Sequence, residues 1–149
     1  MKKMDVRALC EKLKRAGVVG AGGAGFPTYA KIGEGIDTVI LNCAECEPLL
    51  KPHRQLLQLH AGVVLKGLDL LRESVGAARA IVALKPSYTA AAEAARAELD
   101  AFPHLTLSYL PEIYPAGDEI VLIYETTGRT VGPGQLPRSV GVCVFNVET

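Results

Sequence analysis

Apolar positions along the chain form short β-branched runs that alternate with stretches of helical spacing. These runs predict strands at 37–42, 78–86 and 140–146, of which the first is expected to be buried, and an alternating pattern predicts a strand at 104–110. The helical spacing predicts helices at 4–15, 53–74 and 87–102, with a short helix that Pro27 opens and Lys31 closes. Residues 118–128 are ambiguous, and we assign a helix because Asp118 suits its start and Gly128 its end.

The order of these elements predicts the architecture. Ser87 is expected to cap the helix at 87–102, and Gly76 to end the helix at 53–74. Strands and helices alternate, which favours a parallel or mostly parallel sheet of about four strands with helices on both faces. We therefore expect one three-layer α/β/α domain over residues 1–149. The chain stops directly after a strand, at "NVET", so we expect a fragment of a larger protein.

Composition narrows the class of protein. The chain has 149 residues and is 49% hydrophobic, so we expect it to form a hydrophobic core. It carries no net charge, so we expect no general affinity for nucleic acid. No apolar run has the length of a membrane span. The four cysteines include one close pair, Cys43 and Cys46, which is typical of a cytosolic protein with reduced thiols.

A glycine-rich loop, "GVVGAGGAGFPT" at 17–28, is the first candidate site. Gly20, Gly22 and Gly25 satisfy G-x-G-x-x-G, and Glu45 follows at the distance of a ribose-binding acid. A charged helix precedes the glycines where that motif needs a strand, which argues against a dinucleotide fingerprint. A second interpretation is a bare backbone that approaches a flavin or nucleotide, with Phe26 stacking on it. A plain turn is the third.

Two acidic segments are further candidates. Asn42, Glu45 and Glu47 in "NCAECEP" follow a strand, where carboxylates can hold ribose or ribityl hydroxyls or remain solvated. Cys43 and Cys46 form C-x-x-C, for which redox and metal roles are both open, although a zinc site lacks its second pair. In "YPAGDE", the two acids either complement a helix dipole or reach a ligand.

Four stretches together resemble a known family. "GAGGAGFPTYAK", "NCAECEP", "YPAGDE" and "NVET" occur in the order seen in the flavin-binding domain of the NADH-oxidising subunit of respiratory complex I. With "TGRTVGPGQLP", the closer resemblance is to the Rnf-complex C subunit and the cobalamin-reductase-like flavoproteins. The likeness covers roughly residues 15 to 149.

The resemblance implies a Rossmann-like domain that binds FMN and accepts hydride from NADH, with no catalytic side chain and no metal ligand. Flavin-side residues would be Gly20, Gly22, Gly23, Lys31, Asn42, Glu45, Tyr114, Gly117 and Asn146. Residues on the NADH side would be Phe26, Glu47, Asp118 and Glu119. The cofactor carries the hydride chemistry, and the protein orients it.

The resemblance also implies partners. The four cysteines lack the spacing of an iron–sulfur cluster, so electrons would pass to an iron–sulfur domain or subunit outside this chain. We expect a cytoplasmic protein, held by a complex at the inner face of the membrane. Ala21, Ala44, Cys46 and Phe145 depart from the complex I pattern. These departures support an alternative, a cofactor-free interaction or structural domain that retains the fold.

Overall fold

A computed structural model of the chain describes residues 5–21, 24–47 and 49–149. Helices and strands alternate along it as the apolar pattern predicts. In chain order they are α1 (Val6–Arg15), α2 (Thr28–Lys31), β1 (Thr38–Asn42), α3 (Pro52–Val75), β2 (Arg79–Leu84), α4 (Thr89–Leu99), β3 (Leu105–Tyr109), α5 (Glu119–Thr127), the 3-10 helix η1 (Pro137–Val140) and β4 (Val142–Asn146).

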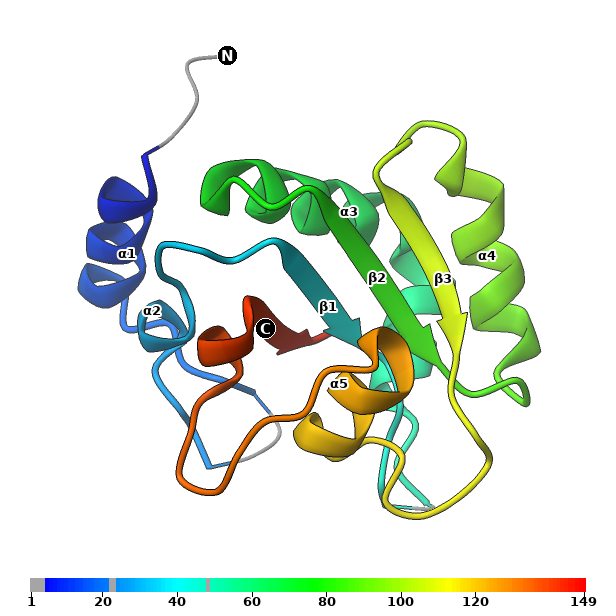
Figure 1. The fold of residues 1–149 in the computed structure, drawn as a ribbon. Coiled ribbons are helices and arrows are strands. Elements are labelled where there is room, and N and C mark those ends of the chain that lie inside the picture. Colours follow the sequence, from blue (N-terminus) through cyan, green and yellow to red (C-terminus); the bar gives the residue numbers. More distant parts are fainter. Residues whose placement is uncertain (1–4, 22–23, 48) are drawn as a thin grey trace.

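The four strands form one parallel sheet in the order β3-β2-β1-β4. Helices α3 and α4 cover one face and α5 covers the other, while α1 and α2 lie beyond the β4 edge (Figure 1). The predicted α/β architecture with a parallel sheet of four strands is therefore confirmed. In the described residues no helix is both long and apolar enough to cross a membrane.

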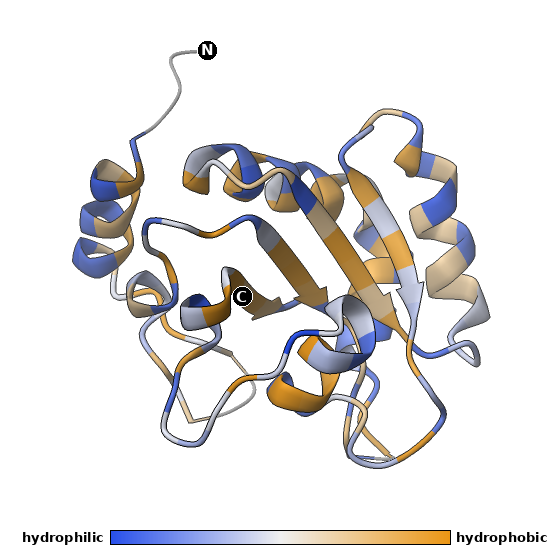
Figure 2. Ribbon diagram, in the orientation of Figure 1, coloured by the Kyte–Doolittle hydropathy of each residue, from blue (hydrophilic) through white to orange (hydrophobic). Residues whose placement is uncertain are grey.

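Strands β1, β2 and β4 are apolar on both faces, whereas the edge strand β3 alternates apolar and polar residues (Figure 2). Val39 and Leu41 pack with α3 and α4, whereas Ile40 packs with α5. Both faces of a parallel sheet are covered by its crossover helices, which explains why β1, β2 and β4 read as continuous apolar runs. The sheet is thus a rigid platform for the loops at its carboxyl edge.

Some predicted boundaries are corrected. Ser87 does not cap α4, because Tyr88 holds the N-cap position and the Ser87 amide donates to the Glu112 carboxylate at 2.7 Å. Residues 137–139, expected as loop, and Val140, expected to start a strand, form a 3-10 turn opened by Pro137, so β4 begins only at Val142. Gly76 and Gly128 end their helices with positive φ, as predicted.

Candidate functional site

The strand order reverses between β1 and β4. Chain progression runs from β1 outward through β2 to β3, and then returns to the opposite side of β1 as β4. In open α/β sheets, ligands bind at the carboxyl ends of strands where such a reversal opens a crevice. Asn42 and Asn146 are paired in register at the ends of these two strands, so they mark this position.

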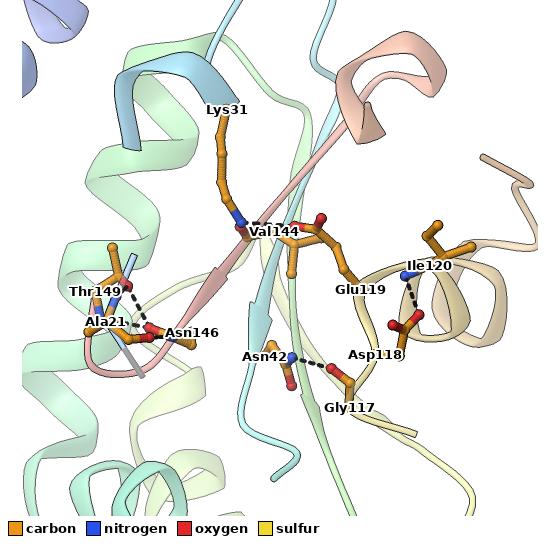
Figure 3. A network of polar contacts seen from close by, with 10 residues as sticks. All are labelled: Ala21, Lys31, Asn42, Gly117, Asp118, Glu119, Ile120, Val144, Asn146 and Thr149. Carbon is orange, nitrogen blue, oxygen red and sulfur yellow. Dashed lines mark hydrogen bonds and ion pairs between the residues drawn. The ribbon is translucent and has the colours of Figure 1, made fainter. Parts of the chain in front are cut away.

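Asn42 joins the loop after β1 to the loop before α5. Its Nδ2 donates to the Gly117 carbonyl at 2.9 Å, and its Oδ1 accepts from the Ala44 amide at 2.9 Å (Figure 3). A Cβ at Gly117 would lie 2.5 Å from the Ala44 carbonyl oxygen, so only glycine fits. Gly117 therefore has a structural reason to be glycine, independent of any flavin.

Asn146 attaches the glycine loop to the end of β4. Its Nδ2 donates to the Ala21 carbonyl, and the Ala21 amide donates to Thr149 Oγ1 at 3.1 Å. The Thr149 amide in turn donates to Asn146 Oδ1 at 2.9 Å (Figure 3). Sequence reasoning singled out Asn146 but missed Thr149, although both lie in the "NVET" motif. Gly22 and Gly23 lie outside the described residues.

The base of the glycine loop is closed by backbone hydrogen bonds. The Gly20 amide donates to the Phe26 carbonyl at 2.8 Å, and the Thr28 amide donates to the Val18 carbonyl at 3.1 Å. Gly25 has a φ of +66°, a conformation that favours glycine. The described ends of the loop are therefore held together and lead into the four-residue helix α2, rather than into the long helix that a dinucleotide fingerprint requires.

Lys31 lies at the centre of a polar contact beside the edge strand β4. Its Nζ donates to Glu119 Oε1 at 2.9 Å and to the Val144 carbonyl at 3.0 Å (Figure 3). The ammonium also lies 5.9 Å from the centre of the Phe26 ring. Phe26 and Lys31 of the glycine-rich motif therefore meet Glu119 of the "YPAGDE" motif at one place.

A cavity of about 150 Å³ adjoins this contact. Its walls come from α2, η1, β4 and the start of α5, and its residues include Phe26, Lys31, Glu119, Leu136, Arg138 and Val144. Phe26 is 40% exposed, so its ring is available to a ligand. Leu136 and Arg138 were not singled out from the sequence, because their segment reads as an ordinary loop.

Glu45 points away from that cavity, toward the start of α3. It is 6% exposed, and its Oε1 accepts from the His53 amide at 3.0 Å. The carboxylate thus satisfies a free amide at the positive end of a helix. Its Oε2 is buried and has no hydrogen-bond partner among the described residues, with Arg54 Nε 3.8 Å away.

The remaining candidates are dispersed. Asp118 caps α5 by accepting hydrogen bonds from the amides of Ile120 and Val121 at 3.0 and 3.2 Å. This agrees with the interpretation in which the acid complements the helix dipole. Tyr114 is 76% exposed, and Glu47 is exposed in the loop after β1. Neither contacts the Lys31 group or lines the cavity in the described part of the chain.

Of the cysteine pair, Cys43 is a poor candidate for a reactive thiol. Cys43 is fully buried in the core, and burial raises the pKa of its thiol to about 12, so the reactive thiolate is scarce at neutral pH. Within residues 5–21, 24–47 and 49–149 no group of three or more metal-ligating side chains occurs. Cys43 is best explained as a small core residue.

Comparison with known proteins gives one family. The family model described as the Nuo51 FMN-binding domain matches residues 13–149. The chain is 45% identical over 145 residues to cobalamin reductase PduS of Citrobacter freundii, covering 97% of this chain and 32% of that protein. It is 38% identical over 153 residues to the C subunit of the Na⁺-translocating ferredoxin:NAD⁺ oxidoreductase complex of Acetobacterium woodii, covering 100% of this chain and 34% of that one.

A solved structure is similar as well. A chain of an NAD⁺-reducing [NiFe]-hydrogenase in its H₂-reduced state superposes with a TM-score of 0.80 at 28% identity, over 97% of this chain and 29% of that one. The chain therefore spans about a third of the length of the curated relatives it matches. The resemblance inferred from the four sequence motifs is confirmed.

Proposed function

This chain belongs to the family of Nuo51 FMN-binding domains, and from that premise we propose that it binds FMN and oxidises NADH by hydride transfer to the flavin. Electrons then pass to iron–sulfur centres outside this chain. Two similar proteins support the nicotinamide half of the proposal, since their names describe an NAD⁺ oxidoreductase complex and an NAD⁺-reducing hydrogenase.

The observation that carries the proposal is the position of the glycine loop. Asn146 and Thr149 bind Ala21 and so hold the loop at the carboxyl end of β4, beside the reversal in strand order. A bare backbone at such a crevice offers amides to a phosphate or a close surface to a flat ring.

The residues at this edge fit the chemistry of FMN. An anionic group of FMN would compete with Glu119 for the Lys31 ammonium, and a ribityl hydroxyl would supply the donor that the buried Glu45 Oε2 lacks among the described residues. The 150 Å³ cavity is smaller than the roughly 300 Å³ of a small ligand cleft, so FMN would lie along the strand ends beside it.

We propose two sets of contacts within the site. Lys31, Asn42 and Asn146 would hold the flavin, together with Gly20, Gly22, Gly23, Glu45, Tyr114 and Gly117. Phe26 and Glu119 would meet NADH, together with Glu47 and Asp118. FMN, when bound, supplies two-electron uptake and one-electron release. The chain's own residues bind, orient and exclude water, and no side chain needs to exchange a proton.

Flavin titration tests the proposal. Flavin-free protein titrated with FMN and with FAD should bind FMN more tightly, because the matching family model is described as an FMN-binding domain and FMN is a mononucleotide. Binding is followed by quenching of flavin fluorescence. Equal or tighter binding of FAD would count against the assignment, and anaerobic bleaching of bound FMN by NADH checks the hydride step separately.

One observation favours a second function. The polar groups of Lys31, Asn42 and Asn146 already have partners within this chain. A cofactor-free interaction domain that keeps the fold would look the same. That function predicts a folded protein that binds neither flavin, so the same titration separates the two.

We also propose that the domain works inside a larger electron-transfer assembly with an iron–sulfur partner. A relative named as a subunit of an ion-translocating oxidoreductase complex supports association with a membrane complex, and we propose the inner face of the membrane as its place. Recovery of the tagged protein in the membrane fraction together with an iron–sulfur protein would support this, and recovery alone in the soluble fraction would oppose it.

A further inference from the structure

The cavity beside β4 has room for one flat group and has an aromatic wall. Its volume of about 150 Å³ is half that of a small ligand cleft, so it takes part of a ligand rather than a whole dinucleotide. The lining includes the partly exposed Phe26 and the apolar residues Leu136 and Pro137. Planar heterocycles pack well against such a ring.

The charges around the cavity are unequal. Lys31 and Glu119 form an ion pair with atoms 2.9 Å apart, so their charges compensate each other. Arg138 is the remaining charged residue of the lining. Among the described residues its guanidinium makes no hydrogen bond and no ion pair, which leaves one positive charge without compensation at this cavity.

Neighbouring acidic groups do not supply a partner for Arg138. Glu34 lines the adjoining hollow with Arg138, yet the ion pair of its carboxylate is with Arg7 Nη2, 3.9 Å away. By comparison, Arg72 and Arg129 are each tied to an aspartate and a backbone carbonyl. Arg138 therefore lines a cavity and, unlike Arg72 and Arg129, its guanidinium contacts neither an aspartate nor a backbone carbonyl among the described residues.

Arg138 is nevertheless held in place. It lies in η1, which Pro137 opens, and the Gly141 amide donates to the Arg138 carbonyl at 3.1 Å. The Ser139 amide donates to the Leu136 carbonyl at 2.9 Å, which fixes the same turn. A guanidinium on a fixed backbone is suited to bidentate binding of phosphate.

We infer that Arg138 binds a phosphate group on the adenosine end of a nicotinamide dinucleotide, whose base packs on Phe26 in this cavity. The inference rests on the proposed function for the identity of the ligand. The phosphate belongs either to the diphosphate bridge or to a ribose 2′-phosphate, and both present the same oxygens to a guanidinium. The second source would make the domain prefer NADPH.

Calorimetric titration of the flavin-free chain with adenosine, ADP and 2′-AMP tests this assignment. The unaltered protein should bind ADP or 2′-AMP more tightly than adenosine, and added salt should reduce only that difference. Arg138→Gln should reduce the difference by roughly three- to tenfold, because the side chain is exposed and partly screened. Arg138→Lys should retain part of it, and Arg15→Gln, an exposed arginine of α1, should retain all of it.

The probe whose tighter binding is lost in Arg138→Gln identifies the phosphate that Arg138 binds. Loss of discrimination for ADP alone assigns the diphosphate bridge, and loss for 2′-AMP alone assigns the 2′-phosphate. Equal binding of all three probes by the unaltered protein, or unchanged ratios in Arg138→Gln with an unchanged melting temperature, would overturn the inference. The titration contains no flavin, so a failure of FMN binding is recorded separately and does not affect this result.

Discussion

At Gly117 two loops touch where no side chain has room. A Cβ there would meet the Ala44 carbonyl oxygen at 2.5 Å and Cys46 Sγ at 2.9 Å. Gly117→Ala should therefore lower the free energy of unfolding by about 1–3 kcal/mol, measured by urea denaturation. Gly67→Ala in α3 is the control, since nothing lies within 4 Å of its added Cβ. Equal stability of the two variants would show that the loops separate freely.

Asp37 connects the start of β1 to the segment before β4. A hydrogen bond from Arg129 Nη1 at 2.8 Å, assisted by Thr38, holds the pKa of its carboxyl below the ordinary value. A lowered pKa in the folded state adds stability above the unfolded-state pKa of about 4, and this is lost as pH falls through the folded value.

Asp37→Asn should therefore destabilise the protein more at pH 7 than at pH 3. The loss at pH 7 should stay below about 1 kcal/mol, because the carboxylate is half exposed and screened by solvent. Urea denaturation at both pH values measures it. Glu125→Gln, which removes an exposed carboxylate, is the control. A loss that is the same at both pH values would contradict a role for the ionised carboxylate.

At the scale of elements, α3 is capped from outside its own sequence. The Glu45 carboxylate accepts from the His53 amide at the helix start. Glu45→Gln should lower the free energy of unfolding by about 1–2 kcal/mol, because it removes a charge from a helix N-terminus and buries a new donor. Glu47→Gln, two residues on and exposed, should change it by less than about 0.5 kcal/mol. Similar losses in both variants would reject the capping role.

Elements that carry their own end signals could be predicted from the sequence. Helix α5 was predicted although its residues are β-branched, because Asp118 and Gly128 encode its ends locally. Strands β1, β2 and β4 were found because both of their faces are buried, which leaves continuous apolar runs, and the edge strand β3 was found from its alternation of apolar and polar residues. The parallel sheet followed from their alternation with helices.

Contacts between distant segments could not be predicted in this way. The cap of α3 by Glu45 depends on a loop returning to a helix start, and the place of Arg138 beside Phe26 depends on tertiary folding. The family motifs assigned Lys31 to the flavin and Phe26 and Glu119 to NADH, and they did not indicate that Lys31 contacts both of the other residues. The sequence did not reveal that Gly117 is required by backbone packing.

At the scale of the whole molecule, the reversal of strand order assembles the site. The crossover through α5 returns the chain to β4 beside β1, and this brings Glu119 to Lys31 and Asn146 to the glycine loop. Segments from both ends of the sequence thus meet at one edge of the sheet. The central claim is that this edge binds FMN.

The dissociation constant of FMN, measured by fluorescence quenching, tests that claim most directly. Lys31→Gln should weaken FMN binding about tenfold, because it removes a charged hydrogen bond at the proposed site. Lys66→Gln, on the exposed face of α3, should leave the constant unchanged. Tight FMN binding by the unaltered protein with this difference is the predicted result. No FMN binding by a folded protein, or equal binding by both variants, would contradict the account.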